Sequence, residues 1–239
     1  MKSKSLACAV WIAGLLFVPG TVVFVPGTVG AQATPPAKVR ADTLPPTIPI
    51  FPLPDTVLFP NVSLPLHIFE PRYRAMVADA LKGDRIIGMV LLQPGFEANY
   101  EGRPPVYPTG GAGVITQVEQ LPDGRYNIVL QGLVKFRISG EDQSRSYRLA
   151  RVTAMPEFPS NEERAALRKQ RQRLEALLAE PGSEPRFPPE IRDEDLVNAL
   201  AQYVELEAIQ RQALLEEQGV LSRSQALIDL LELKVILPR

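Results

Sequence analysis

Between residues 48 and 155, apolar and polar residues alternate in short runs that predict β-strands. The runs occupy residues 48–53, 64–69, 86–92, 114–121, 125–130, 134–138 and 147–155. Alternation with a period of two is typical of strands with one buried face, whereas a continuous apolar run such as 86–92 predicts burial on both faces. Several short strands separated by close turns indicate a small closed or semi-closed antiparallel barrel.

Glycine and proline positions refine these strands. An Asp123-Gly124 pair between two alternating runs predicts a hairpin in which Gly124 adopts a positive φ. Gly132 separates the returning arm from the next run. The prolines within residues 48–53 predict an edge or bulged strand, because proline cannot donate a hydrogen bond to a neighbouring strand.

Helical patterns occur once among the strands and again after Pro159. Residues 71–82 have proline in the first turn and an apolar stripe at helical spacing. The later helices are expected at residues 161–180, 194–204, 208–218 and 223–236. Ser222 precedes Gln225 by three residues, as in a capping box at the start of the last helix. We therefore predict an α+β chain, with a barrel-like domain that contains one helix and a small helical bundle after it.

The N-terminal residues have the features of a secretory signal peptide. Lys2 and Lys4 precede an uncharged run at 6–18, and Val29-Gly30-Ala31 supplies the small residues of a cleavage site. We expect an extracytoplasmic protein, periplasmic or secreted. The alternatives are an uncleaved anchor, which two Pro-Gly pairs disfavour, and lipidation of Cys8, which lies within the apolar run instead of after it.

Composition shifts then divide the chain. The expected parts are a signal peptide at 1–31, a proline-rich linker at 32–47, a β domain at 48–158, a helix and proline-rich connection at 159–192, and a helical bundle at 193–239.

Charge and composition exclude several function classes. Lys and Arg number 26 against 27 Asp and Glu, for a net charge of −1. This balance disfavours a dedicated nucleic-acid binder, which normally has a large basic excess. One histidine and one cysteine are too few for a zinc site or a disulfide framework, although a carboxylate-only metal site is compatible with the composition. We expect no cofactor and no metal.

Three segments are specific enough to compare with a known family. They are IPIFPLP at 48–54, VLFPN at 57–61 and LPLHIFEPRY at 64–73, and further pieces follow in order at 87–92, 113–115, 121–126, 136–138, 196–200 and 212–216. Together they resemble the N-terminal, substrate-binding domain of Lon proteases over roughly residues 47–233. The resemblance implies a PUA-like barrel that recognises exposed peptide segments.

The chain departs from a complete Lon enzyme in ways that bear on activity. It has no phosphate-binding Gly-x-x-x-x-Gly-Lys-Ser/Thr loop, and the glycines at 110–113 more plausibly let the backbone bend into a strand. The family's catalytic positions have no counterpart, so none is carried over. We therefore expect a stand-alone binding module without the ATPase and protease modules, and not an enzyme.

Candidate site residues are few. His67 is the only possible imidazole base, yet its place in an alternating strand favours a solvent-facing side chain. Glu70 and Arg72 flank Pro71 at a helix start, where capping is the more plausible role for Glu70. Phe51, Phe59, Phe69 and Tyr73 are expected in the core.

The loop at 93–109 is the candidate peptide-binding region. Phe96, Tyr100 and Tyr107 lie there among glycines and prolines, either to grip apolar groups of a peptide or to pack against the barrel. Residues regarded as family signature with a structural role are Pro52, Pro54, Phe59, Pro60, Phe69, Glu70, Arg72, Tyr73, Asp123 and Gly124.

The resulting hypothesis is a non-catalytic module that recognises unfolded proteins, peptides or a partner protein, with a role in protein quality control of the cell envelope. Three alternatives remain: a structural docking subunit of an envelope assembly, a hydrolase dependent on His67, and an RNA-binding PUA-like module. No nucleic acid and no membrane span after signal cleavage are expected.

Overall fold

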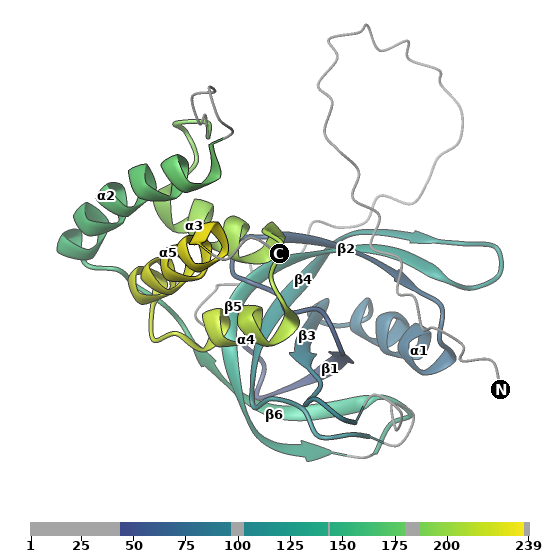
Figure 1. The fold of residues 1–239 in the computed structure, drawn as a ribbon. Helices are drawn as coiled ribbons and strands as arrows, with labels where there is room; N and C mark the ends of the chain where they lie inside the picture. The colour runs from purple at the N-terminus through teal and green to yellow at the C-terminus, as the bar shows by residue number, and fades with distance from the viewer. Residues whose placement is uncertain (1–43, 97–102, 143, 180–186, 237–239) are drawn as a thin grey trace, which may run out of the picture.

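The computed structural model describes residues 44–96, 103–142, 144–179 and 187–236 (Figure 1). The expected signal peptide and most of the expected linker lie outside the described residues. The strands are β1 (Thr47–Leu53), β2 (Ser63–Ile68), β3 (Ile86–Leu91), β4 (Thr109–Gln120), β5 (Tyr126–Asp142) and β6 (Arg148–Met155). The helices are α1 (Pro71–Ala80), α2 (Asn161–Leu178), α3 (Asp193–Tyr203), α4 (Ala208–Glu216) and α5 (Val220–Ile236).

The six strands form one sheet that closes on itself. Their order is β2-β5-β4-β3-β1-β6, and β5 also pairs with β6. The first half of β5 pairs with β2 and its second half with β6, so a single strand of 17 residues serves two neighbours on one edge. The prediction that Gly132 divides this region into two arms was therefore wrong. The predicted fold class, a barrel-like β domain followed by helices, is confirmed.

Strand β1 departs from the sequence expectations in two ways. It pairs in parallel with β3, from Ile50 opposite Gly88 to Leu53 opposite Leu91, so the sheet is mixed and not wholly antiparallel. The crossover that a parallel pair requires is supplied by β2 and α1. Strand β1 is also flanked on both sides, because Thr47 to Ile50 pair with β6. Each neighbour covers only one half of β1, which leaves an unpaired side where proline is tolerated.

The hairpin between β4 and β5 agrees with the prediction. Gln120 and Tyr126 form its last pair, and Gly124 has φ +80°. The Asp123 carboxylate accepts hydrogen bonds from the Arg125 backbone N–H (3.1 Å) and from its Nε (2.6 Å), which fixes the turn. These hydrogen bonds hold the pKa of Asp123 below its usual value.

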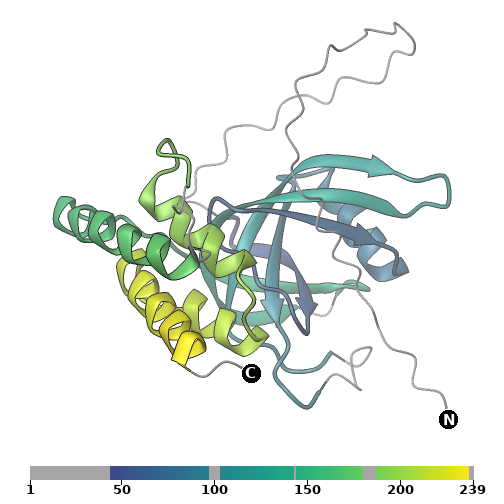
Figure 2. The same ribbon diagram turned by 45° about the horizontal axis from the view of Figure 1, so that its top comes forward.

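Helices α2, α3, α4 and α5 pack together on one side of the barrel, whereas α1 lies on the opposite side (Figures 1 and 2). Helix α2 starts with a capping box in which Ser160 and Glu163 satisfy each other's backbone N–H groups. The last helix begins at Val220, so the capping box predicted for Ser222 and Gln225 was wrong; the Ser222 hydroxyl bonds to the backbone of Gly219 instead. No helix in the described part of the chain is both long and apolar enough to cross a membrane.

An irregular segment between β1 and β2 joins the barrel to the helices. Leu58 points into the barrel core, while Val57 and Phe59 pack among the buried residues of the helices. The Gln202 side chain of α3 donates to the Val57 carbonyl (3.0 Å) and accepts from the Phe59 N–H (3.2 Å). The amide thus takes the place of a neighbouring strand for a buried stretch of backbone, and consecutive residues of this segment contribute to the apolar core of the barrel and to that of the helices.

Candidate peptide-binding groove

A groove lies where the barrel meets the helices. It has a volume of about 260 Å³, and its apolar lining includes Val134 of β5, Met155 of β6 and Val220 of α5. Phe158 also lines it, with 78% of the residue exposed, which is the largest exposed fraction among the large apolar residues described. Exposed apolar surface beside a hollow is typical of interaction sites.

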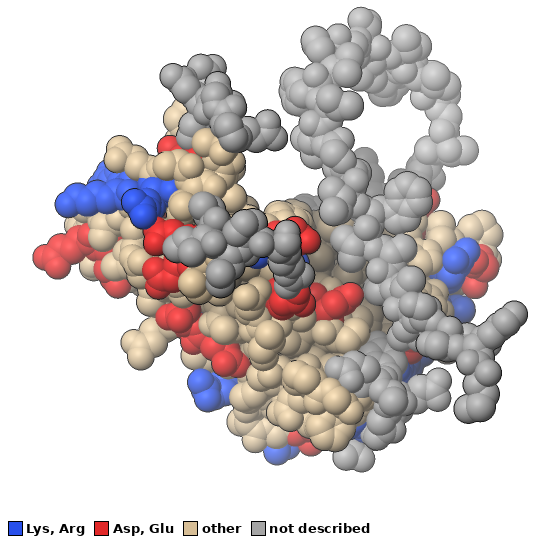
Figure 3. All heavy atoms as spheres, in the orientation of Figure 1, with Lys and Arg blue, Asp and Glu red and all other residues tan. Residues whose placement is uncertain are grey.

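Charged residues of the helices form the other wall of the groove. Arg164 of α2 pairs with Glu194 of α3 at 2.7 Å, and Arg192 pairs with Asp195 at 2.8 Å. Figure 3 shows Lys and Arg side chains gathered over α2, with acidic side chains close to them. Their charges are therefore largely balanced locally, as expected for a solvated helix face.

Beneath the groove lies a buried ion cluster of Lys135, Glu157 and Arg223. The Glu157 carboxylate contacts Lys135 Nζ at 2.6 Å and Arg223 at 2.6 and 3.0 Å. The side chains of Lys135 and Arg223 are only 1% and 0% exposed, and that of Glu157 is 12% exposed. One carboxylate is therefore shared by two buried cations, one from the barrel and one from α5.

Further hydrogen bonds complete the buried ion cluster. Arg223 Nε donates to the Leu214 carbonyl (3.0 Å), and one Nη donates to Asn198 Oδ1 (2.7 Å). The Arg223 guanidinium also lies 5.4 Å from the centre of the Phe59 ring, and Lys135 donates to the Glu217 carbonyl. The cluster thus joins β5, the segment after β6, α3, α4 and α5, and gives the groove a fixed floor.

Burial and charge act in opposite directions on the Glu157 carboxyl. Burial alone raises its pKa, but the hydrogen bonds and charges of Arg223 and Lys135 outweigh burial and hold the pKa below the ordinary value. Burial lowers the pKa of Lys135, and the Glu157 carboxylate partly opposes that effect. The pKa of Glu157 is thus lowered by its two cationic neighbours, and the pKa of Lys135 is lowered mainly by its burial.

His67 is fully engaged in a hydrogen-bond network on β2. Asn127 Nδ2 donates to Glu119 (2.8 Å), so its Oδ1 faces His67 Nδ1 at 2.7 Å and requires a proton on that nitrogen. Arg125 lies 3.3 Å from Nε2 and can only donate, so Nε2 accepts. An imidazole with both ring nitrogens engaged by neighbouring side chains is poorly placed to act as a general base.

The signature residues around the start of α1 have structural partners. Phe51 and Tyr73 are buried with ring centres 4.3 Å apart, whereas Phe69 is 45% exposed, so its expected core position was wrong. Phe69 follows the inward-facing Ile68 and therefore points outward, 6.3 Å from the His67 ring. Glu70 occupies the N-cap position of α1, but its side chain does not cap and binds Arg72 at 3.0 Å.

The remaining predicted residues are distributed over the molecule. Pro52 is buried within β1, Pro54 is exposed after it, and Pro60 lines the groove. Tyr107 packs against the apolar core of the helices, and Phe96 is 42% exposed. Tyr100 lies outside the described residues. Of these two loop residues, Tyr107 is therefore packed against the core and Phe96 is exposed to solvent.

Among the described residues, no group of three or more His, Cys, Asp or Glu side chains is placed to hold a metal ion. The binding features identified above are an apolar hollow, an exposed aromatic ring and a rigid charged floor.

Comparison with protein families agrees with this architecture. The model of a family described as the ATP-dependent protease La (LON) substrate-binding domain matches residues 47–232. The chain belongs to this family. The match extends from β1 into α5, so this Lon substrate-binding domain includes the barrel, the groove and the helices.

Related proteins match the Lon-type domain at moderate identity. Lon protease 2 of Myxococcus xanthus is 28% identical over 208 residues, which are 84% of this chain and 25% of that protein. A Lon protease of Trichlorobacter lovleyi is 31% identical over 158 residues, or 63% of this chain and 19% of that protein. The chain therefore spans a quarter or less of the length of these relatives.

Solved structures show the same fold. The N-terminal domain of a Mycobacterium avium complex Lon protease has a TM-score of 0.56 and 23% identity, and the match covers 78% of this chain and 98% of that one. A Lon N-terminal domain protein from Xanthomonas campestris has a TM-score of 0.53 and 22% identity, with 77% and 97% covered.

Sequence reasoning did not identify the main residues of the Lon-type groove. Lys135 looked like the polar residue of an alternating strand, and Phe158 lay in a short segment between predicted elements. The sequence does indicate that Phe158 is exposed, because it lies between Glu157 and Pro159 in a segment that belongs to no predicted helix or strand. No local signal links Lys135 with Arg223.

Proposed function

We propose that this chain is a non-catalytic receptor that binds exposed apolar segments of unfolded or partly folded proteins in the groove between barrel and helices. The observation that carries the proposal is Phe158, 78% exposed beside an apolar hollow whose floor is held by the buried ion cluster. Membership in the Lon substrate-binding family supports protein segments as the ligand class.

Burial of apolar surface is sufficient as the driving force. It contributes about 25 cal/mol per Å², and full burial of a phenylalanine side chain contributes about 1.5–3 kcal/mol. A groove of about 260 Å³ receives only a small part of an extended chain, so we expect affinities in the micromolar range. Weak, reversible binding of this kind suits a protein that samples many clients.

The hydrolase alternative receives no support from the described residues. The Nε2 of His67 accepts from Arg125 at 3.3 Å and its Nδ1 bonds to Asn127 at 2.7 Å. A nucleophile–base pair needs one of these nitrogens to face a hydroxyl or thiol.

Replacing Phe158 with alanine should weaken binding of a permanently unfolded chain, reduced and carboxymethylated lactalbumin, by about tenfold. The reason is loss of the one large apolar side chain that stands exposed at the groove. Titration calorimetry with wild type and variant measures the change in Kd.

Phe96→Ala is the matched control, since it removes the same side chain from another exposed position. We expect it to change the Kd by less than about twofold, because Phe96 does not line the groove. A larger loss for Phe96→Ala than for Phe158→Ala would instead place the binding surface on the loop at 93–109.

We further propose that the protein acts outside the cytoplasm, in quality control of envelope proteins. The support is the N-terminal sequence, with Lys2 and Lys4 before an apolar run and Ala31 at a suitable cleavage position. N-terminal sequencing of protein isolated from the cell envelope should give Gln32 as the first residue. A first residue of Met1 in protein from the cytoplasmic fraction would contradict the proposal.

A further inference from the structure

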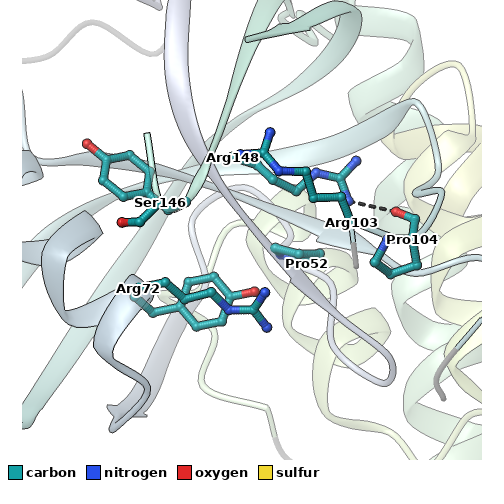
Figure 4. A pocket seen from close by; sticks show the side chains of 8 residues that line it. Pro52, Arg72, Arg103, Pro104, Ser146 and Arg148 are labelled. Carbon is teal, nitrogen blue, oxygen red and sulfur yellow. Dashed lines mark hydrogen bonds between the residues drawn. The ribbon is translucent and has the colours of Figure 1, made fainter. Parts of the chain in front are cut away.

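Three arginine side chains from distant segments converge on a second hollow, separate from the groove. It lies between β1, α1 and the start of β6 and has a volume of about 40 Å³. Arg72 comes from the first turn of α1, Arg103 from the segment before β4, and Arg148 from the first position of β6 (Figure 4). The described lining residues include no Asp or Glu.

Two of the three guanidinium groups already have carboxylate partners. Arg72 pairs with Glu70 at 3.0 Å. Arg148, which is buried, forms a two-pronged ion pair with Glu141 and donates to the Pro104 carbonyl at 2.7 Å (Figure 4). The carboxylates of Glu70 and Glu141 hold these side chains in place around the hollow but lie outside its lining.

Arg103 differs because no carboxylate of the described residues forms an ion pair with it. One Nη donates to the Arg145 carbonyl at 3.0 Å, while Nη1 is buried and has no hydrogen-bond partner among the described residues. Asp142 has a lowered pKa, chiefly because it accepts hydrogen bonds from Ser144, and the charge of Arg103 contributes least. A buried donor without a partner is costly, so such groups in native structures usually have a ligand or a function.

The backbone at Arg103 is also unusual. Its φ is +59°, in the left-handed region that a residue with a long side chain rarely adopts. Backbone strain of this kind is concentrated at binding and catalytic sites. Here the strained conformation coincides with the residue whose Nη1 lacks a partner at the hollow.

We propose that this hollow binds one oxyanion group, a carboxylate or a phosphate. A guanidinium presents a planar fork of donors that matches such groups. A buried water needs about 10–15 Å³. At about 40 Å³, the hollow has room for about three waters or one small anion. It shares no lining residue with the groove, so this proposal does not rest on the proposed peptide binding.

Titration of the chain with inorganic phosphate tests the proposal, with Arg103→Gln as the decisive variant. We expect one phosphate site in the wild type, weakened at least about tenfold by Arg103→Gln, and a rise in Tm with phosphate that the variant lacks. Arg168→Gln is the matched control, since it removes the same charge from an exposed position on α2, outside this hollow. It should change the affinity less than about twofold.

A tripeptide with a free C-terminal carboxylate, compared with its C-terminal amide, identifies the source of the anion. Competition by the acid alone indicates a peptide terminus, and binding of phosphate alone indicates a free ion. Arg103→Gln removes a buried donor without a partner together with the hydrogen bond to the Arg145 carbonyl, so the two losses oppose each other and its Tm without ligand should be close to that of the wild type. Arg103→Lys, which keeps the charge, is the second variant and should lose less affinity for phosphate than Arg103→Gln. Absence of binding by both probes, or equal loss in Arg103→Gln and Arg168→Gln, would overturn the proposal.

Discussion

Glu157→Gln should lower the free energy of unfolding by about 3–5 kcal/mol at neutral pH. The carboxylate is the shared partner of Lys135 and Arg223, whose side chains are 1% and 0% exposed. The amide has nearly the same shape but no charge, so two buried cations remain with no anion between them. Chemical denaturation of wild type and variant measures the difference.

Lys135→Met is the control for this prediction. Methionine fills a similar volume without a charge, and removal of Lys135 leaves Glu157 paired with Arg223 alone. Because the remaining Glu157–Arg223 pair is neutral overall, no buried charge is left without a partner, and we expect a change smaller than about 1 kcal/mol. If both variants lost the same stability, the packing of the strand, and not the charge balance, would explain the effect.

Acid should remove the difference between wild type and Glu157→Gln. The pKa of Glu157 is lowered by Arg223 and Lys135 against the effect of burial, so the folded protein binds this proton less readily than the unfolded chain. The resulting stability is complete above the pKa of the unfolded chain and is lost as the pH falls through the lower, folded pKa. Denaturation curves of wild type and variant should therefore converge as the pH falls below the lowered, folded pKa of Glu157.

The sequence predicts most of the barrel because alternation is a local signal. Asp123-Gly124 marks its hairpin correctly, since the turn requires a positive φ that Gly124 supplies. The parallel pairing of β1 with β3 has no local signal, because it depends on how β2 and α1 cross between them. The segments that resemble Lon proteases predict the fold without reference to alternation, and the family match over residues 47–232 confirms that resemblance.

The buried ion cluster could not be predicted, and the reason lies in how β5 is covered. Val134, Lys135 and Phe136 are all buried, because the barrel interior covers one face of β5 and the helices cover the other. Alternation assigns Lys135 to solvent, which is correct only for a strand with one free face. Its partners lie after β6 and on α5, and only the tertiary fold brings the three charges together.

Gly132→Ala should destabilise the protein by about 3 kcal/mol or more. A Cβ at Gly132 would lie 2.0 Å from the carbonyl oxygen of Phe59, far inside van der Waals contact. The backbone cannot easily shift away, because the Gly132 N–H donates to the Val62 carbonyl (2.8 Å) and its carbonyl accepts from the Asn61 N–H (2.9 Å). Thermal and chemical denaturation should both show the loss.

Gly83→Ala provides the comparison, since a Cβ there meets only one backbone oxygen, at 4.0 Å. We expect a change within about 0.5 kcal/mol for this exposed position. Gly132 was interpreted from sequence as a break between two strand arms, whereas its φ is not positive and its strand continues. Position 132 requires glycine because the backbone of residues 57–62, which joins the barrel to the helices, passes close to it. If alanine were tolerated at position 132, this segment would have to be able to move away from β5.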